Sequence, residues 1–162
     1  MKTLVIATQN AKKRRELEEL VRGQFLVRNL ADIGLADIVI DESADSFSGN
    51  ARIKVDTVLA ALPPGVRAET FAVLGDDSGL IVDMLDGKPG VRSARFAADH
   101  GVGAGDDANN ALLLLLLAAV PDAMRAARFA SAVCAVVVDS GAHLEAFGTV
   151  EGRSSYDLVG GG

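Results

Sequence analysis

The chain opens with a segment, residues 2–7, whose last four residues are apolar and which leads through a polar turn directly into a helical pattern. The apolar segment is typical of a buried strand. Residues 11–22 carry Leu17, Leu20 and Val21 at helical spacing, which predicts an amphipathic helix. A strand followed at once by a helix is the first half of a βαβ unit, so the chain begins as an α/β fold.

Later segments predict a mixed sheet. We expect strands at residues 25–27, 38–40, 71–74 and 80–82, helices at 46–62 and 107–119, and a β-hairpin of 129–138 with 143–150. Residues 75–79, Gly-Asp-Asp-Ser-Gly, should break the strand before them. Parallel units come first and the hairpin last, so we expect an α/β fold: a mixed twisted sheet with helices on both faces. The 162 residues fit one domain, residues 1–162.

Composition argues against several classes of protein. The net charge of −6 repels phosphate backbones, which disfavours a nucleic-acid partner. The most apolar run, residues 111–120, is too short to span a bilayer, and the apolar stretch near the N-terminus is too short for a signal peptide. We therefore expect a cytoplasmic protein without a membrane partner. The lone Cys134 lies in an apolar run and should be a buried thiol.

The polar turn after the first strand is a candidate phosphate site. It consists of Thr8, Gln9 and Asn10, and the helix after it begins Ala11-Lys12-Lys13-Arg14-Arg15. A helix N-terminus presents unpaired N–H donors and a partial positive charge, which suit phosphate. Four cations there oppose the helix dipole, so their presence indicates a bound anion nearby. A solvated basic face explains the same residues equally well.

Two acidic clusters are candidate metal ligands. Asp76 and Asp77 are adjacent carboxylates, which repel each other unless a cation such as Mg²⁺ lies near them. The alternative is an Asp-rich turn. Glu42 precedes the second helix and could complete the site, or it could simply complement the helix dipole.

Other polar residues carry a weaker signal. Arg95 follows a Pro-Gly turn and suits phosphate recognition, although a solvated arginine is the commoner case. Asn50 and Lys54 lie four residues apart on one face of the second helix, where exposure to water is the favoured interpretation.

Together these segments resemble the inosine triphosphate pyrophosphatase family. The matching residues are Ala7-Thr8-x-Asn10-x-x-Lys13-x-x-Glu16, Ser46-Phe47-x-x-Asn50-Ala51-x-x-Lys54, and Asp76-Asp77-Ser78-Gly79-Leu80-x-Val82-Asp83-x-Leu85-x-Gly87-x-Pro89-Gly90-Val91-x-Ser93-Ala94-Arg95-Phe96. The last segment is long and highly specific. The three occur in the family's order, and the resemblance covers nearly the whole chain.

The resemblance implies an ITPase-like fold, a homodimer, and Mg²⁺-dependent hydrolysis of ITP, dITP and XTP to the monophosphate and pyrophosphate. Such an enzyme cleanses the nucleotide pool. The resemblance also implies roles for individual residues. The triphosphate would bind residues 8–13, which are Thr8, Gln9, Asn10, Ala11, Lys12 and Lys13, and the substrate would also contact Ser78 and Arg95. Asp77 would activate water, and Mg²⁺ would bind Glu42, Asp76 and Asp77.

The sequence departs from the family's usual pattern at several positions. Gln9 and Ala44 stand where the family has glycine, and Gly49 stands where it has an acid. The family continues past a glycine-rich turn into segments that hold the purine base. This chain ends at Gly162, so we expect the C-terminal part of the fold to be missing.

Two alternatives remain open at this stage. One is a truncated, catalytically weak nucleotide-binding or dimerisation module. The other is a septum-inhibitor-like nucleotide pyrophosphatase, which prefers modified pyrimidines. The block from Asp76 to Leu80 favours the purine family, and release of pyrophosphate from ITP with magnesium would separate an enzyme from a binding module.

Overall fold

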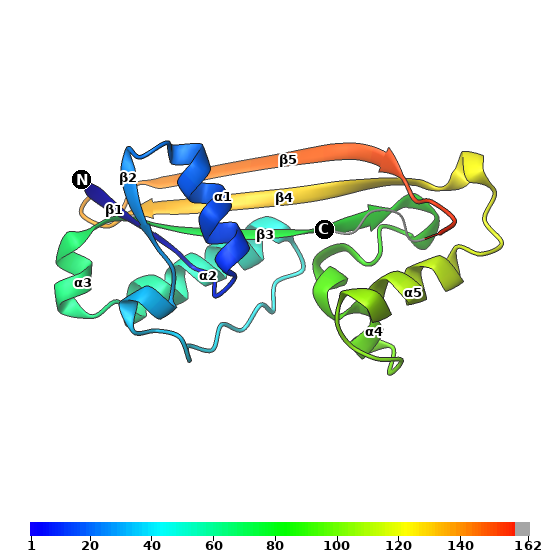
Figure 1. Cartoon of the computed structure of the whole chain (residues 1–162), viewed down its shortest axis with the longest axis horizontal. Helices are drawn as coiled ribbons and strands as arrows, with labels where there is room; N and C mark the ends of the chain where they lie inside the picture. The colour runs from blue at the N-terminus through cyan, green and yellow to red at the C-terminus, as the bar shows by residue number, and fades with distance from the viewer. Residues whose placement is uncertain (158–162) are drawn as a thin grey trace. The chain divides into compact units, whose positions relative to one another are not determined.

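The structure is a computed structural model that describes residues 1–157 (Figure 1). Its strands are β1 (Lys2–Ile6), β2 (Phe25–Arg28), β3 (Thr70–Val82), β4 (Ala126–Val137) and β5 (His143–Arg153). Its α-helices are α1 (Ala11–Val21), α2 (Phe47–Ala61), α3 (Pro64–Glu69), α4 (Phe96–Asp99) and α5 (Asp106–Leu116). The glycine triplet 160–162, on which the expectation of a missing C-terminal part rests, lies outside the described residues.

The strands form one mixed sheet in the order β2-β1-β3-β4-β5. β1 pairs in parallel with both β2 and β3. The Val138 N–H, just past the end of β4, donates to the carbonyl of Phe71 at 2.9 Å. The last residues of β4 therefore lie beside the first residues of β3, which is the antiparallel arrangement. The expected order of parallel units first and a hairpin last is confirmed.

The strand order places α1 and α2 on opposite faces of the sheet. From β1 the chain passes through α1 to β2 on one side, and from β2 it passes through α2 to β3 on the other side. Connections between parallel strands are almost always right-handed, so two connections that run in opposite directions cover opposite faces. The expected α/β fold with helices on both faces is confirmed.

The contacts divide the chain into two compact units. The first contains Met1–Asp77 and Ala132–Phe147, and the second contains Ser78–Ser131 and the chain from Gly148. Fully buried valines fill the first unit: Val5, Val55, Val58 and Val73. In the second, Val82, Leu117 and Ala127 form one buried cluster, and α4 packs beside α5 around Phe96 and Leu112 (Figure 1).

Two sequence predictions about strands are wrong. Residues 38–40 form no strand; they lie in an irregular segment where the Ile38 N–H closes a turn onto the Leu35 carbonyl at 3.2 Å. Ile38 and Ile40 line a cavity instead of pairing with the sheet. Residues 75–79 do not break the sheet either, because β3 runs unbroken from Thr70 to Val82. Lysines that lie against Asp76 and Asp77 relieve their repulsion, so both fit within a strand.

Among the helices within residues 1–157, none is both long and apolar enough to cross a bilayer.

Candidate active site

The candidate site lies where β1 ends and β3 continues. Ile6, the last residue of β1, pairs with Leu74, and the Ala7 N–H donates to the Leu74 carbonyl at 2.7 Å. From Gly75 onward β3 extends past the end of β1. β2 and β3 flank β1 on opposite sides, so this point is a topological switch, where open α/β sheets bind ligands.

A cavity of about 310 Å³ lies at this switch point. Its lining residues come from the turn after β1, from the irregular segment before α2, from α2 and from β3: Ala7, Thr8, Gln9, Asn10, Leu30, Ile38, Ile40, Glu42, Lys54 and Asp76. The lining therefore combines apolar side chains with charged and amide groups.

The turn of residues 8–10 is tied to the start of α1 by its own side chains. The Asn10 N–H donates to Thr8 Oγ1 at 3.1 Å, and Asn10 Oδ1 accepts the Lys12 N–H at 2.8 Å. Asn10 is thus the N-cap of α1, as short polar residues often are. Gln9 donates its amide to the Ala36 carbonyl, which links this turn to the segment before α2. The positive end of the α1 dipole lies next to a half-buried Lys13.

Successive side chains of β3 point to opposite faces of the sheet. Gly75 and Asp77 share one face, and α2 packs there so closely that a Cβ on Gly75 would lie 2.6 Å from the Ala51 carbonyl oxygen. Asp76 points to the other face, where Lys13 of α1 forms an ion pair with it. The carboxylate of Asp76 is therefore paired with a lysine of α1, and the face that Asp77 occupies is covered by α2.

α2 supplies two further polar groups to the site. Its N-cap is Ser46, whose hydroxyl accepts the Gly49 N–H at 3.1 Å. One turn later the fully buried Asn50 donates to Asp77 Oδ2 at 3.1 Å. Lys54 Nζ lies 2.9 Å from Glu42 Oε2 and 3.5 Å from Asp77 Oδ1, and it donates to the Asp76 carbonyl at 2.9 Å. Lys54 thus joins all three predicted acidic residues.

One polar atom in this network has no partner. Asp76 Oδ1 is buried and accepts no hydrogen bond from any described residue. Buried carboxylate oxygens are usually satisfied by a donor, a water or an ion, so this atom is a suitable ligand for a cation. Within residues 1–157 no three Asp, Glu, His or Cys side chains gather closely enough to hold a metal by themselves. Mg²⁺ needs only one or two carboxylates when phosphate oxygens complete its shell, so the residues fit an ion that a phosphate group also ligates.

The first unit brings together most of the predicted site residues: residues 8–13, Glu42, Asp76 and Asp77. Within that set Lys12 is exposed, whereas Asp77 is only 7% exposed. Ser78 and Arg95 belong to the second unit and both are exposed. Ser78 lines a cavity of about 560 Å³ there, and Arg95 ends a 3₁₀ helix, Gly90–Arg95.

The interpretation that Asn50 and Lys54 face water is wrong. Asn50 is fully buried and the Lys54 side chain is 12% exposed. Their spacing of four residues was the available signal, since it places both on one helix face. A single sequence does not indicate which face of α2 packs against the sheet.

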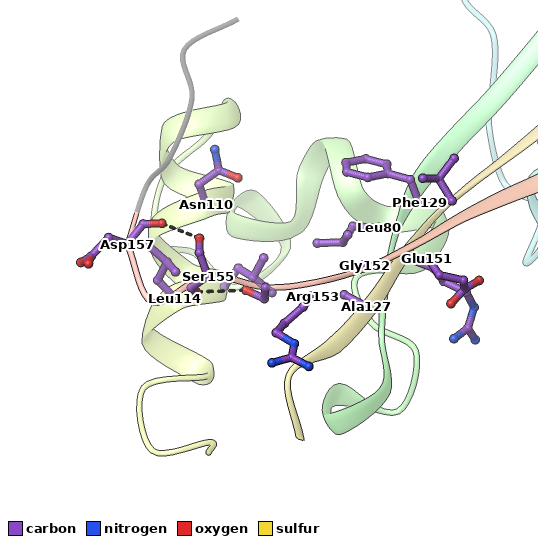
Figure 2. A pocket seen from close by; sticks show the side chains of 14 residues that line it. Leu80, Asn110, Leu114, Ala127, Phe129, Glu151, Gly152, Arg153, Ser155 and Asp157 are labelled. Atoms are coloured by element: carbon purple, nitrogen blue, oxygen red, sulfur yellow. Dashed lines mark hydrogen bonds between the residues drawn. The ribbon is translucent and has the colours of Figure 1, made fainter. Parts of the chain in front are cut away.

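The second unit contains a pocket with several large apolar side chains in its lining. Its volume is about 350 Å³, and Figure 2 shows Leu80, Leu114 and Phe129 among the side chains that line it. The chain after β5 forms part of its wall, where the Ser155 hydroxyl donates to the Asp157 carbonyl at 2.6 Å. The fully buried Arg125 holds this segment by donating to the carbonyls of Ser154 and Ser155. The lysine–carboxylate network described above belongs to the first unit alone.

Comparison with known families identifies the chain. Residues 4–160 match the model of the Ham1 family, and the chain belongs to that family. A relative from Exiguobacterium sp., named dITP/XTP pyrophosphatase, is 42% identical over 158 residues, which are 97% of this chain and 74% of the relative. A relative of the same name from Nocardia farcinica is 41% identical over 145 residues, 87% of this chain and 65% of the relative. The chain thus spans about two thirds to three quarters of the length of these relatives.

Solved structures agree with this assignment. The Staphylococcus aureus Ham1 protein superposes with a TM-score of 0.80 at 28% identity, covering 98% of this chain and 75% of that one. The dITP/XTP pyrophosphatase from Mycobacterium abscessus gives a TM-score of 0.72 at 34% identity, covering 98% and 77%. The family and ITPase-like fold expected from the sequence are confirmed, and the expected enzyme class, a nucleoside triphosphate pyrophosphatase, is that of these relatives.

Proposed function

We propose that this Ham1-family chain hydrolyses non-standard purine nucleoside triphosphates, with ITP, dITP and XTP as substrates, to the monophosphate and pyrophosphate. The observation that carries the proposal is the cavity beside the N-terminus of α1: Lys54 and Asp76 line it, Lys13 is paired with Asp76, and Asp77 is paired with Lys54. Cations and a helix N-terminus suit a polyphosphate, while the aspartates suit a metal and a proton. The names of the relatives support the choice of substrate.

The chain's own residues have separate tasks in this reaction. The α1 N-terminus with Thr8 and Asn10 binds phosphate oxygens, and Lys13 exchanges Asp76 for the triphosphate when the substrate enters. Asp77 accepts a proton from the water whose oxygen attacks the α-phosphorus. The bond from that phosphorus to its bridging oxygen breaks, and pyrophosphate leaves with the electron pair. Lys54 contacts the carboxylates of both Glu42 and Asp77, and so fixes their positions relative to each other.

Magnesium fits this site through Asp76, whose buried Oδ1 is unpaired. Glu42 and Asp77, which both contact Lys54, are further proposed ligands on the resemblance. When bound, the ion would neutralise phosphate charge and favour ionisation of water. Asp76 would bind it through Oδ1 and release Lys13. Lys54 would keep the remaining carboxylates from repelling one another. Ser78 and Arg95 are proposed substrate contacts from the second unit, on the resemblance alone.

The setting of the enzyme is also part of the proposal. A role in cleansing the nucleotide pool requires access to the precursors of nucleic-acid synthesis, so we place the protein in the cytoplasm. We further propose that it acts as a homodimer, which the resemblance implies. Sedimentation of the purified chain at several concentrations tests the dimer, and a single monomer species would contradict it.

The experiment for the proposed function compares triphosphates under one set of conditions. Purified protein with Mg²⁺ is supplied with ITP, XTP, dITP, ATP or a pyrimidine triphosphate, and pyrophosphate and inorganic phosphate are measured separately. We expect pyrophosphate from the non-standard purines. Binding without turnover would instead support a nucleotide-binding module, and preference for pyrimidines would support the septum-inhibitor-like alternative. Release of inorganic phosphate would contradict attack at the α-phosphorus.

A further inference from the structure

We propose that Asn50 is the positioning residue for Asp77: it holds one oxygen of the carboxylate and leaves the other, Oδ1, for the reacting water. The inference rests on the proposed function, in which Asp77 accepts the proton of that water. Because the Asn50 side chain is uncharged, its proposed effect is on the orientation of the Asp77 carboxylate.

Both ends of the Asn50 amide are used. Its Nδ2 donates to Asp77 Oδ2 at 3.1 Å, and its Oδ1 accepts the N–H of Ala44 at 3.0 Å. The side chain is fully buried. Asn50 therefore ties the carboxylate of β3 to the backbone of residues 42–44, the segment that carries Glu42. One side chain fixes the spacing of two acidic groups that come from distant parts of the sequence.

The two oxygens of Asp77 have different surroundings. Oδ2 accepts a hydrogen bond of ordinary length, 3.1 Å, from Asn50, whereas Oδ1 has Lys54 Nζ at 3.5 Å, the limit of a hydrogen bond. The better-held oxygen is the one less able to take a further proton. Oδ1 keeps lone pairs that are not committed, so the structure assigns proton transfer to it.

A neutral donor suits this task better than a cation. A second lysine at residue 50 would hold the carboxylate but would also draw charge from it and weaken it as a base. An amide donor fixes the plane of the carboxylate with a weaker electrostatic effect. General bases act only within hydrogen-bond reach of their proton, so a carboxylate free to rotate would lose turnover rather than substrate affinity.

The chain offers a matched control in Asn109. This asparagine is also buried and also bridges two groups, accepting the Ala97 N–H at 2.8 Å and donating to the Ala94 carbonyl at 3.2 Å. Its two partners are backbone atoms of the second unit. Loss of the Asn109 amide should thus lower stability in the way that loss of Asn50 does, without reaching Asp77.

The test compares Asn50→Ala and Asn50→Leu with Asn109→Ala in the full chain, by thermal unfolding and by steady-state hydrolysis of ITP with Mg²⁺. We expect each Asn50 variant to lower kcat by about 10- to 100-fold, the range typical of groups that orient a functional residue, with KM changed by less than about 3-fold. Asn109→Ala should lower kcat by less than about 3-fold when folded. Asn50→Leu keeps a branched side chain without adding a donor or a charge, so it replaces Asn50→Ala if that variant does not fold.

A double-mutant cycle separates positioning from general damage. In the background of Asp77→Asn, the residual kcat should fall by less than about 2-fold on adding Asn50→Ala, because Asn50 acts through Asp77. Equal losses of kcat in both backgrounds would overturn the proposal, and so would a folded Asn50→Leu that keeps its kcat. A wild-type chain without turnover would instead contradict the proposed function, together with the inference that rests on it.

Discussion

The carbonyl oxygen of Ala51 lies so close to Gly75 that a Cβ on this glycine would be 2.6 Å from it. The same Cβ would lie 3.0 Å from Val55 Cγ2 and 3.1 Å from Lys54 Cβ. The obstacle is backbone, which cannot rotate out of the way. The absence of a side chain at residue 75 thus sets how near α2 comes to β3, and with it the reach of Lys54 to the aspartates.

We therefore predict that Gly75→Ala lowers both stability and turnover, because it moves Lys54 relative to Asp76 and Asp77. Forcing α2 outward should lower the free energy of unfolding by about 1–3 kcal/mol. It should also lower kcat by up to about 100-fold, because a shift of about 1 Å in a catalytic group can have that effect. Gly65→Ala is the control, since a Cβ on Gly65 of α3 would meet nothing within 4 Å. Equal behaviour of the two variants would show that the close approach has no role.

The contact between Lys13 and Asp76 leads to a prediction about substrate affinity. Lys13→Ala should raise the KM for ITP by about 10- to 100-fold, the value of one hydrogen bond to a charged group. The effect should shrink as salt rises, because salt screens exposed charges. Arg15→Ala is a suitable control: Arg15 is an exposed cation on the same helix. An unchanged KM at low salt for Lys13→Ala would remove Lys13 from the triphosphate site.

Two of the departures from the family's usual residues are neighbours in space. A Cβ on Gly49 would lie 2.7 Å from Ala44 Cβ. The space between them holds one side chain, and in this chain Ala44 fills it. We predict that Gly49→Ala lowers the free energy of unfolding by about 1–3 kcal/mol, despite the better helix propensity of alanine. Adding Ala44→Gly should recover part of that loss. Strictly additive effects in chemical denaturation would contradict the coupling.

Much of the fold could be predicted because it depends on local patterns. The helices expected at 11–22 and 46–62 are observed as Ala11–Val21 and Phe47–Ala61, where caps and apolar spacing agree. The strand expected at 38–40 fails because three apolar residues look the same whether they pair with a sheet or cover a cavity. The break expected at 75–79 fails because the carboxylates are neutralised by Lys13 and Lys54, which are distant in sequence.

The sequence predicts those site residues whose charge and place next to an apolar strand or a helix start already indicate their chemistry. Asp76 and Asp77 are adjacent charges directly after an apolar stretch, and Lys13 belongs to the basic run at the start of a helix, so their chemistry is visible in the sequence. Asn50 and Lys54 have a role only through the approach of α2 to Gly75, which is a tertiary contact. A single sequence contains no local signal for that approach.

The buried thiol of Cys134 gives a prediction about pH. Cys134 is 1% exposed, as expected from its apolar surroundings, and burial raises the pKa of its thiol. Above pH about 9 the unfolded chain loses this proton while the folded chain keeps it. The folded state then binds more protons, so stability falls as pH rises past this value. Thermal unfolding from neutral pH to about pH 10 should show a smaller loss for Cys134→Ala than for the wild type. Parallel curves would contradict a raised pKa.

The most direct test of the account is the release of pyrophosphate from ITP by the wild type and by Asp77→Asn, with Mg²⁺ present. The wild type should release pyrophosphate and monophosphate in equal amounts. Asp77→Asn should fold normally and lower kcat by about 10²–10⁴-fold, as loss of a general base does. A folded Asp77→Asn with nearly wild-type turnover would contradict the central claim that this carboxylate activates the water.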